Sequence, residues 1–197
     1  MSLARVVSLA SLVCLVTASA SLASDPGVDT PNVPRVRITD DRLRALFEEG
    51  LQNSPTLREV VSRLERSDVV VYVQPDHYGL SGYAGGLTFL SASGGLRYVV
   101  ARVDWFRAPA QQIAMIGHEL QHAAEVAENP DIVDDASMFR EYIRMGHVNG
   151  WLGSGVAVDT PEAGDIERRV AQELRSMSRP ALPETTPTDE EEDPRNP

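Results

Sequence analysis

The sequence predicts an α+β fold, in which a small and mostly antiparallel sheet packs on one long helix with further helices beside it. Three observations support this class. Apolar residues recur at helical spacing near the start of the domain and again after residue 109. Between these segments lie runs of β-branched residues, and two of the runs flank Ser93-Gly94-Gly95, which is typical of a hairpin turn. Helices grouped before and after the strands, without strict alternation, indicate the α+β class.

The helix and strand limits follow from capping residues and breakers. Thr39-Asp40-Asp41 and Ser54-Pro55 each begin a helix by N-cap chemistry. A long helix begins at Pro109 and ends near Glu128, before Asn129-Pro130. The other predicted elements are strands at 68–74, 87–92 and 96–105, a helix at 134–145, a glycine-rich loop at 147–158 and a last helix capped by Thr160-Pro161.

Composition restricts the partners of the chain. Its 197 residues carry a formal net charge of −11, and every basic residue among the 18 is an arginine. An acidic chain of this kind has no general attraction for nucleic acid or for an anionic membrane surface. We therefore expect neither as a partner.

The two ends of the chain differ in composition from the middle. Residues 1–23 combine one arginine, a short apolar run and small residues, which is typical of a secretory signal peptide, and the only cysteine, Cys14, lies within it. We expect export to the periplasm or the medium, with no membrane insertion after cleavage. A Pro- and Asp-rich linker is predicted at 24–38, a single domain at 39–179 and an acidic, disordered tail at 180–197.

The long predicted helix contains the pattern His118-Glu119-Leu120-Gln121-His122. Residues four apart leave the same face of a helix, so both imidazoles can bind one metal ion. Glu119 lies beside them and is placed to take a proton from a water molecule that the metal activates. The sequence therefore predicts a Zn²⁺ site with His118 and His122 as ligands and Glu119 as the general base.

This motif and the order of elements resemble the zincin metallopeptidases over about residues 68–145. The resemblance implies hydrolysis of a peptide or protein substrate, which an edge strand (96–105 or 87–92) would bind as an added strand. Glu125 and Glu128 stand where metzincins have glycine and histidine, and the chain lacks the cysteine of deformylase-like sites. Similarity to gluzincins implies Glu141 as third ligand, because 18 residues separate it from His122.

Other assignments stay open at this stage. The third ligand can instead be Glu125, Asp159 or His147, and Glu125 can alternatively orient a ligand histidine. We expect His147 to stabilise the oxyanion, and the other donors in question are His77, Tyr78, Tyr83 and Tyr142. Two other functions fit the same motif: a non-catalytic exported module with a structural or vestigial zinc site, and a zinc hydrolase of a non-peptide substrate.

Overall fold

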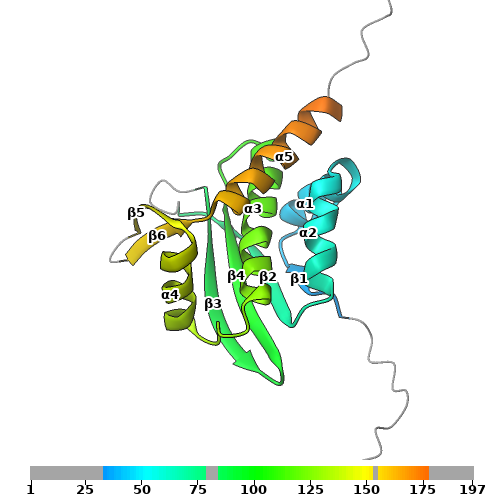
Figure 1. Ribbon diagram of the computed structural model, residues 1–197. Helices are drawn as coiled ribbons and strands as arrows, with labels where there is room; N and C mark the ends of the chain where they lie inside the picture. Colours follow the sequence, from blue (N-terminus) through cyan, green and yellow to red (C-terminus); the bar gives the residue numbers. More distant parts are fainter. Residues whose placement is uncertain (1–32, 79–83, 153–154, 178–197) are drawn as a thin grey trace, which may run out of the picture. The chain divides into compact units, whose positions relative to one another are not determined.

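A computed structural model describes residues 33–78, 84–152 and 155–177 of the chain. The predicted signal peptide, all but the last residues of the predicted linker and the predicted acidic tail lie outside these residues. Within the described part, no helix is both long enough and apolar enough to cross a membrane. The fold is α+β, as predicted, with five helices among the described residues (Figure 1).

Two short helices in the first part of the domain are capped as the sequence predicts. They are α1 (Asp41–Asn53) and α2 (Pro55–Glu65). The Asp40 carboxylate accepts a hydrogen bond from the Leu43 N–H at 2.8 Å, and the Ser54 hydroxyl accepts one from the Leu57 N–H at 3.0 Å. Both bonds satisfy backbone donors that the first turn of a helix leaves free.

The main sheet is mixed, so the prediction of a mostly antiparallel sheet was wrong. Its strands are β1 (Val36–Ile38), β2 (Val69–Asp76), β3 (Gly85–Ser93) and β4 (Leu96–Asp104), in the order β1-β2-β4-β3. The β1–β2 and β2–β4 pairs are parallel, and only the hairpin pair β3–β4 is antiparallel. The prediction failed because Val36–Ile38, assigned to the linker, forms a strand, and because β4 returns beside β2 and leaves β3 at the edge.

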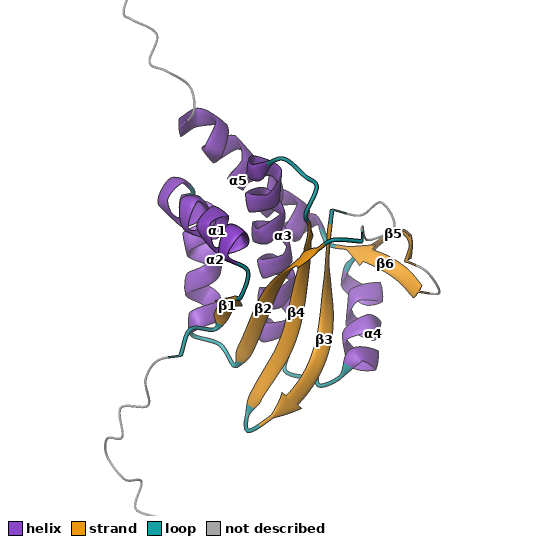
Figure 2. Cartoon of the chain, turned by 180° about the vertical axis from the view of Figure 1, so that it is seen from behind, coloured by secondary structure: helices purple, strands orange, loops and turns teal. Residues whose placement is uncertain are grey.

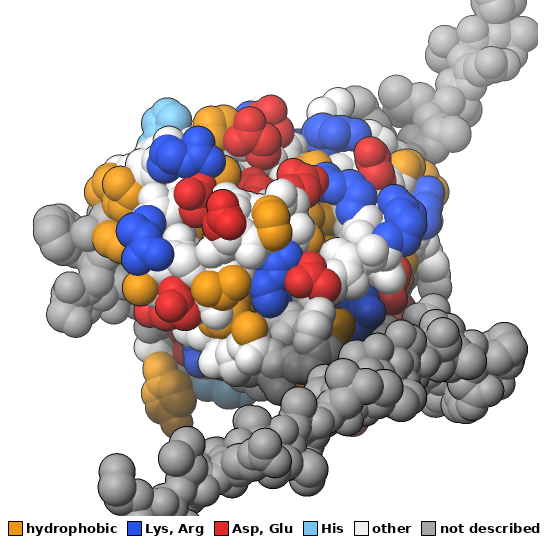
Figure 3. Space-filling view, turned by 60° about the horizontal axis from the view of Figure 1, so that its bottom comes forward, with side chains coloured by type: hydrophobic (Ala, Val, Ile, Leu, Met, Phe, Trp, Pro, Cys, Tyr) orange, Lys and Arg blue, Asp and Glu red, His pale blue; other side chains and the backbone are white. Residues whose placement is uncertain are grey.

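The second half of the domain surrounds the longest helix. It comprises α3 (Pro109–Glu128), α4 (Asp135–Met145), β5 (His147–Leu152), β6 (Gly155–Asp159) and α5 (Pro161–Met177). The glycine-rich segment predicted as a loop is a hairpin of β5 and β6. Figures 1 and 2, which view the domain from opposite sides, show α3 against one face of the sheet and α4 beside the edge strand β3. On the face seen in Figure 3, acidic and basic side chains are interspersed.

Helix α3 is buried on nearly all sides, which exceeds the single apolar stripe that its sequence suggests. Every residue from Gln112 to Val126 is buried. The sheet covers one side, and α5 covers another through a close approach at Gly117, where a Cβ atom would lie 3.2 Å from Val170 Cγ2. The polar side chains of α3 are therefore buried as well, and they need partners inside the protein.

The end of α3 is fixed to the sheet by Arg97 of β4. The buried guanidinium forms two hydrogen bonds to the Asp68 carboxylate, at 2.7 and 2.8 Å. It also donates to backbone carbonyls at the end of α3 and in the turn that follows, namely those of Val126, Ala127, Asn129 and Ile132. These bonds satisfy carbonyl groups that a helix end leaves free and set the position of α3 relative to the strands.

Candidate metal centre

The two histidines of α3 face each other inside the domain. Their Nε2 atoms are 3.1 Å apart, and the side chains are only 7–10% exposed. This is the arrangement predicted from their spacing of four residues on one helix. Burial is greater than expected, because β6 and α5 close over this part of α3.

Asp159, the last residue of β6, completes a three-atom cluster with these histidines. Its Oδ1 atom lies 3.3 Å from His118 Nε2 and 3.5 Å from His122 Nε2. Two ligand atoms on a tetrahedral zinc, each at 2.0–2.1 Å from the ion, are about 3.3–3.4 Å apart. The three measured separations bracket this value, so the donor set and its dimensions fit a single zinc ion.

Each histidine has a second carboxylate at its other ring nitrogen. His122 Nδ1 lies 2.9 Å from Glu125 Oε2, and the Thr160 hydroxyl donates to Glu125 Oε1 at 2.7 Å. His118 Nδ1 lies 3.3 Å from Glu167 Oε2 of α5, without the alignment of a hydrogen bond. Carboxylates in this position fix the tautomer and the ring orientation of metal-binding histidines. The sequence analysis left two roles open for Glu125, third ligand or orienting residue. Its position behind His122 corresponds to the orienting role.

Glu119 lies next to the cluster and is almost fully buried. The residue is 2% exposed, and its Oε2 atom has no hydrogen-bond partner among the described residues. Gly85 of β3 makes room for it, since a Cβ atom there would lie 2.3 Å from Glu119 Oε1 and 2.8 Å from Met115 Sδ. A buried carboxylate with a free oxygen is costly and suggests a function for that oxygen.

The electrostatics of the cluster favour positive charge at its centre. Burial opposes protonation of His118, but Asp159 and Glu167 outweigh it and raise the pKa of His118 to about 10. Burial also opposes protonation of His122, but Asp159 and Glu125 outweigh it and raise the pKa of His122 to about 9. Burial raises the pKa of the Glu119 carboxyl. Four carboxylates around two imidazoles therefore attract protons or, in their place, a cation.

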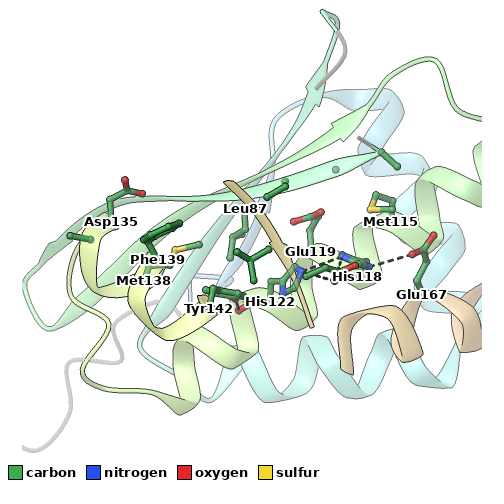
Figure 4. Close-up of a pocket in the computed structure, with 17 residues that line it drawn as sticks. Leu87, Met115, His118, Glu119, His122, Asp135, Met138, Phe139, Tyr142 and Glu167 are labelled. Atoms are coloured by element: carbon green, nitrogen blue, oxygen red, sulfur yellow. Dashed lines mark hydrogen bonds and ion pairs between the residues drawn. The ribbon is translucent and has the colours of Figure 1, made fainter. Parts of the chain in front are cut away.

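The cluster opens into a cleft of about 760 Å³ (Figure 4). Its walls come from five elements and the residue before β3: Ala84, Gly85, Gly86 and Leu87; Met115, His118, Glu119 and His122 of α3; Asp135, Ala136, Met138, Phe139 and Tyr142 of α4; Ala157, Val158 and Asp159 of β6; and Glu167 of α5. The cleft therefore contains the histidines, Asp159 and Glu119 together.

The strand that borders the cleft, β3, has no strand partner on its outer side among the described residues. The Asp104 N–H donates to the Ala84 carbonyl at 2.9 Å, so Ala84 and Asp104 are a hydrogen-bonded pair. Gly85, opposite Val103, and Leu87, opposite Ala101, therefore occupy non-hydrogen-bonded positions of the ladder. Because hydrogen-bonded and non-hydrogen-bonded pairs alternate in an antiparallel ladder, the N–H and C=O groups of Gly85 and Leu87 point away from β4. Of the two strands expected to bind substrate, 96–105 is interior, and 87–92 lies at the edge of the sheet that the described strands form.

Glu141 does not lie in the cluster, so the expectation that it completes the site is not supported by its position. Its carboxylate pairs with Arg144 at 2.7 Å and is absent from the lining of the cleft. The reason is its place on α4. Tyr142 points inward and donates to the His122 carbonyl at 2.8 Å, and Glu141, about 100° around the helix, points elsewhere. The gluzincin-like spacing therefore does not carry over to this fold.

The expected oxyanion donors are scattered. His147 is exposed at the start of β5, outside the lining of the cleft, but it pairs with Asp159 across the hairpin. The hydroxyl of Tyr142 is engaged by the His122 carbonyl. The ring of His77 packs against Trp105 at a tilt of 54°, with centroids 4.8 Å apart, and Tyr78 is 97% exposed. Tyr83 lies outside the described residues.

Two residues of the site were missed by the sequence reasoning, Thr160 and Glu167. Thr160 was identified only as the cap of the last helix, a role confirmed by its hydroxyl accepting the Ala163 N–H at 3.2 Å. The same hydroxyl donates to Glu125. Asp159, directly before this cap, was one of the alternatives for the third ligand. No signal in the sequence distinguishes Glu167 from other acidic residues of α5.

Comparison of the chain with models of protein families, with curated proteins and with solved structures finds no match. The function must therefore be argued from the site alone.

Proposed function

We propose that this chain is a zinc-dependent hydrolase that cleaves peptide bonds. The observation that supports this most is the triangle of His118 Nε2, His122 Nε2 and Asp159 Oδ1, with sides of 3.1, 3.3 and 3.5 Å. Three protein ligands and an open side toward a cleft are typical of a catalytic zinc site, whereas structural zinc sites are closed by four ligands.

Zinc held by these three residues would polarise the substrate carbonyl and lower the pKa of the attacking water. Glu119 accepts the proton of that water and later donates it to the leaving amine. Its burial favours this role, because a raised pKa brings a carboxyl group closer to the neutral range in which both proton transfers are efficient. Glu125 and Glu167 orient the two imidazoles from behind.

The substrate lies along β3 in this proposal. The outward N–H and C=O groups of Gly85 and Leu87 would pair with an extended peptide, as an added strand. Such pairing holds the backbone of the peptide without regard to its side chains and brings a carbonyl group past Glu119. This feature favours a peptide over a non-peptide substrate.

His147 remains our proposed donor to the oxyanion. Directly opposite residues on paired strands project from the same face of a hairpin. His147 and Asp159 are such a pair, so the imidazole leaves the hairpin on the side of the metal ligand. Export, the signal peptide and the acidic tail likewise remain proposals based on the sequence pattern.

The test combines metal analysis with one substitution. The purified full chain is expected to contain about one zinc per molecule and to hydrolyse peptides, with loss of activity on chelation and recovery on adding zinc. Glu119→Gln should keep the zinc and lose at least about a hundredfold in kcat/KM. Glu128→Gln, an exposed glutamate nine residues further on the same helix, is the matched control and should keep full activity.

Two results would contradict the proposal. A zinc-free protein whose stability does not change in His118→Ala would exclude the metal site. A zinc-loaded protein that hydrolyses nothing, in which Glu119→Gln raises stability, would instead indicate a binding module with a vestigial base.

A further inference from the structure

The cleft continues past His122 into a part walled by apolar side chains. Figure 4 shows these side chains on the side of His122 away from Glu167, and they are Leu87 of β3 with Met138, Phe139 and Tyr142 of α4. Met138 and Tyr142 are buried, and the ring of Tyr142 packs edge-on against His122 with centroids 5.3 Å apart. This region is therefore continuous with the metal cluster, and the buried side chains of Met138 and Tyr142 form its base.

Phe139 forms the outer part of this wall and is 48% exposed. An aromatic side chain that remains half in water gains most when another apolar group covers it. The wall therefore fits a large apolar side chain that enters beside the reacting bond.

Apart from His118 and His122, the ionisable residues that line the cleft are all acidic. Glu119, Asp159 and Glu167 belong to the metal cluster, and Asp135, the first residue of α4, lies beyond the apolar wall in Figure 4. Asp135 has no hydrogen bond or ion pair within the described part of the chain. No arginine lines the cleft among the described residues, so no guanidinium is placed beyond the metal cluster to hold a free terminal carboxylate.

We propose that the cleft selects a peptide with a large apolar side chain next to the reacting carbonyl and a cationic group beyond it, facing Asp135. This inference rests on the proposed function and adds the substrate class. The cationic group is either a basic side chain or a free α-amino group, because both present an ammonium or guanidinium charge to the carboxylate. A substrate held by its terminal carboxylate is disfavoured by the same charges.

The experiment uses the zinc-loaded full chain and four acetylated peptides that combine leucine or alanine with arginine or glutamate at two neighbouring positions. Leucine should exceed alanine at least about tenfold in kcat/KM, as is usual for hydrocarbon groups in apolar pockets. Arginine should exceed glutamate about fivefold, since Asp135 is exposed and its attraction is partly screened. A fifth peptide, which has a free amino terminus and no arginine, distinguishes the two sources of positive charge.

Four variants assign these preferences to residues. Phe139→Ala should reduce the preference for leucine, and Asp135→Asn should abolish the preference for arginine. The controls are Phe106→Ala, an exposed phenylalanine outside the cleft, and Asp131→Asn, an exposed aspartate before α4, and both should keep the two preferences.

A binding measurement separates this inference from the proposed function. The same four sequences, ended by a hydroxamate that binds zinc, are titrated onto the zinc-loaded protein. The same ranking in Kd without any hydrolysis would support the selectivity and contradict the peptidase. Hydrolysis without the ranking, or equal binding of all four ligands, would overturn the selectivity.

Discussion

Two carboxylates that the sequence presents as rivals, Glu141 and Asp159, lie in different surroundings in the fold. Glu141 is in the middle of α4, where its neighbour Tyr142 takes the inward direction and Arg144 binds the carboxylate. Asp159 ends β6, and its carboxylate lies within 3.5 Å of the Nε2 atoms of both histidines. Spacing along the chain favours Glu141, and the direction in which each element presents its side chains favours Asp159.

The difference shows how the fold positions Asp159, the proposed third ligand. Asp159 is the last strand residue before a capped helix, and its Oδ1 atom also accepts the Thr160 N–H at 2.7 Å. Strand β6 fixes one side of this junction, and α5 fixes the other by packing on α3 near Gly117. A residue between two fixed elements is held more firmly than one that a single helix carries.

The largest difference is expected from replacing each rival by alanine. Asp159→Ala removes one of the three proposed ligands and should weaken zinc binding by more than about a hundredfold, beyond the 10–100-fold typical of residues that only orient ligands. Glu141→Ala should leave the affinity unchanged. Competition with a chromophoric chelator measures both, and a reversed order would restore Glu141 as the third ligand.

Gly85→Ala separates the base from the ligands. The new Cβ atom would lie 2.3 Å from Glu119 Oε1, so the carboxylate must move. We expect kcat/KM to fall at least about tenfold, with zinc still bound and about 1–3 kcal/mol of stability lost to overpacking.

The control for this variant is Gly164→Ala in α5, where the nearest heavy atom is Arg168 Nη1 at 3.3 Å on a side chain free to move. This change should keep activity and raise the free energy of unfolding by about 0.5–1 kcal/mol. Unchanged peptide hydrolysis in Gly85→Ala would show that Glu119 does not need its present position.

Local signals explain which parts of the fold were predictable. The caps at Asp40 and Ser54 and the breaker after Glu128 place helices α1 to α3 within a residue or two, because these signals act within one helical turn. The strand at Val36–Ile38 could not be predicted, since three residues between Pro34 and the cap of α1 are too few to show a period, and they form a strand only by pairing with β2.

The site divides in the same way. His118, Glu119 and His122 share one helix, so their geometry follows from the helix itself. Asp159 and Glu167 reach the histidines from another strand and another helix, and only tertiary packing brings them together. The glycine content of 147–158 predicted a loop, yet the segment pairs as a hairpin, which is what presents Asp159.

A smaller effect is expected when a residue that orients a ligand is changed. Glu125→Gln keeps the shape but loses the charge that faces His122 Nδ1 at 2.9 Å. Zinc affinity should fall about 10–100-fold, less than in Asp159→Ala. Glu128→Gln, nearly one turn further along α3, should bind zinc as the unchanged protein does. A loss in Glu125→Gln as large as that in Asp159→Ala would make Glu125 a direct ligand.

The smallest effect tests whether the end of α4 holds the third ligand in place. A Cβ atom on Gly146 would lie 2.5 Å from the Asp159 carbonyl oxygen and 2.7 Å from Val158 Cγ1. The backbone of β6 must therefore move in Gly146→Ala, and the Asp159 carboxylate moves with it. We expect zinc affinity to fall up to about tenfold, which lowers the stabilisation by bound zinc by up to about 1.4 kcal/mol.

Thermal unfolding with and without zinc measures this difference, and Gly164→Ala serves as control because its glycine lies away from Asp159. If zinc raises the Tm of Gly146→Ala as much as that of the unchanged protein, Asp159 is positioned by β6 and α5 alone, and the close approach of α4 contributes only packing.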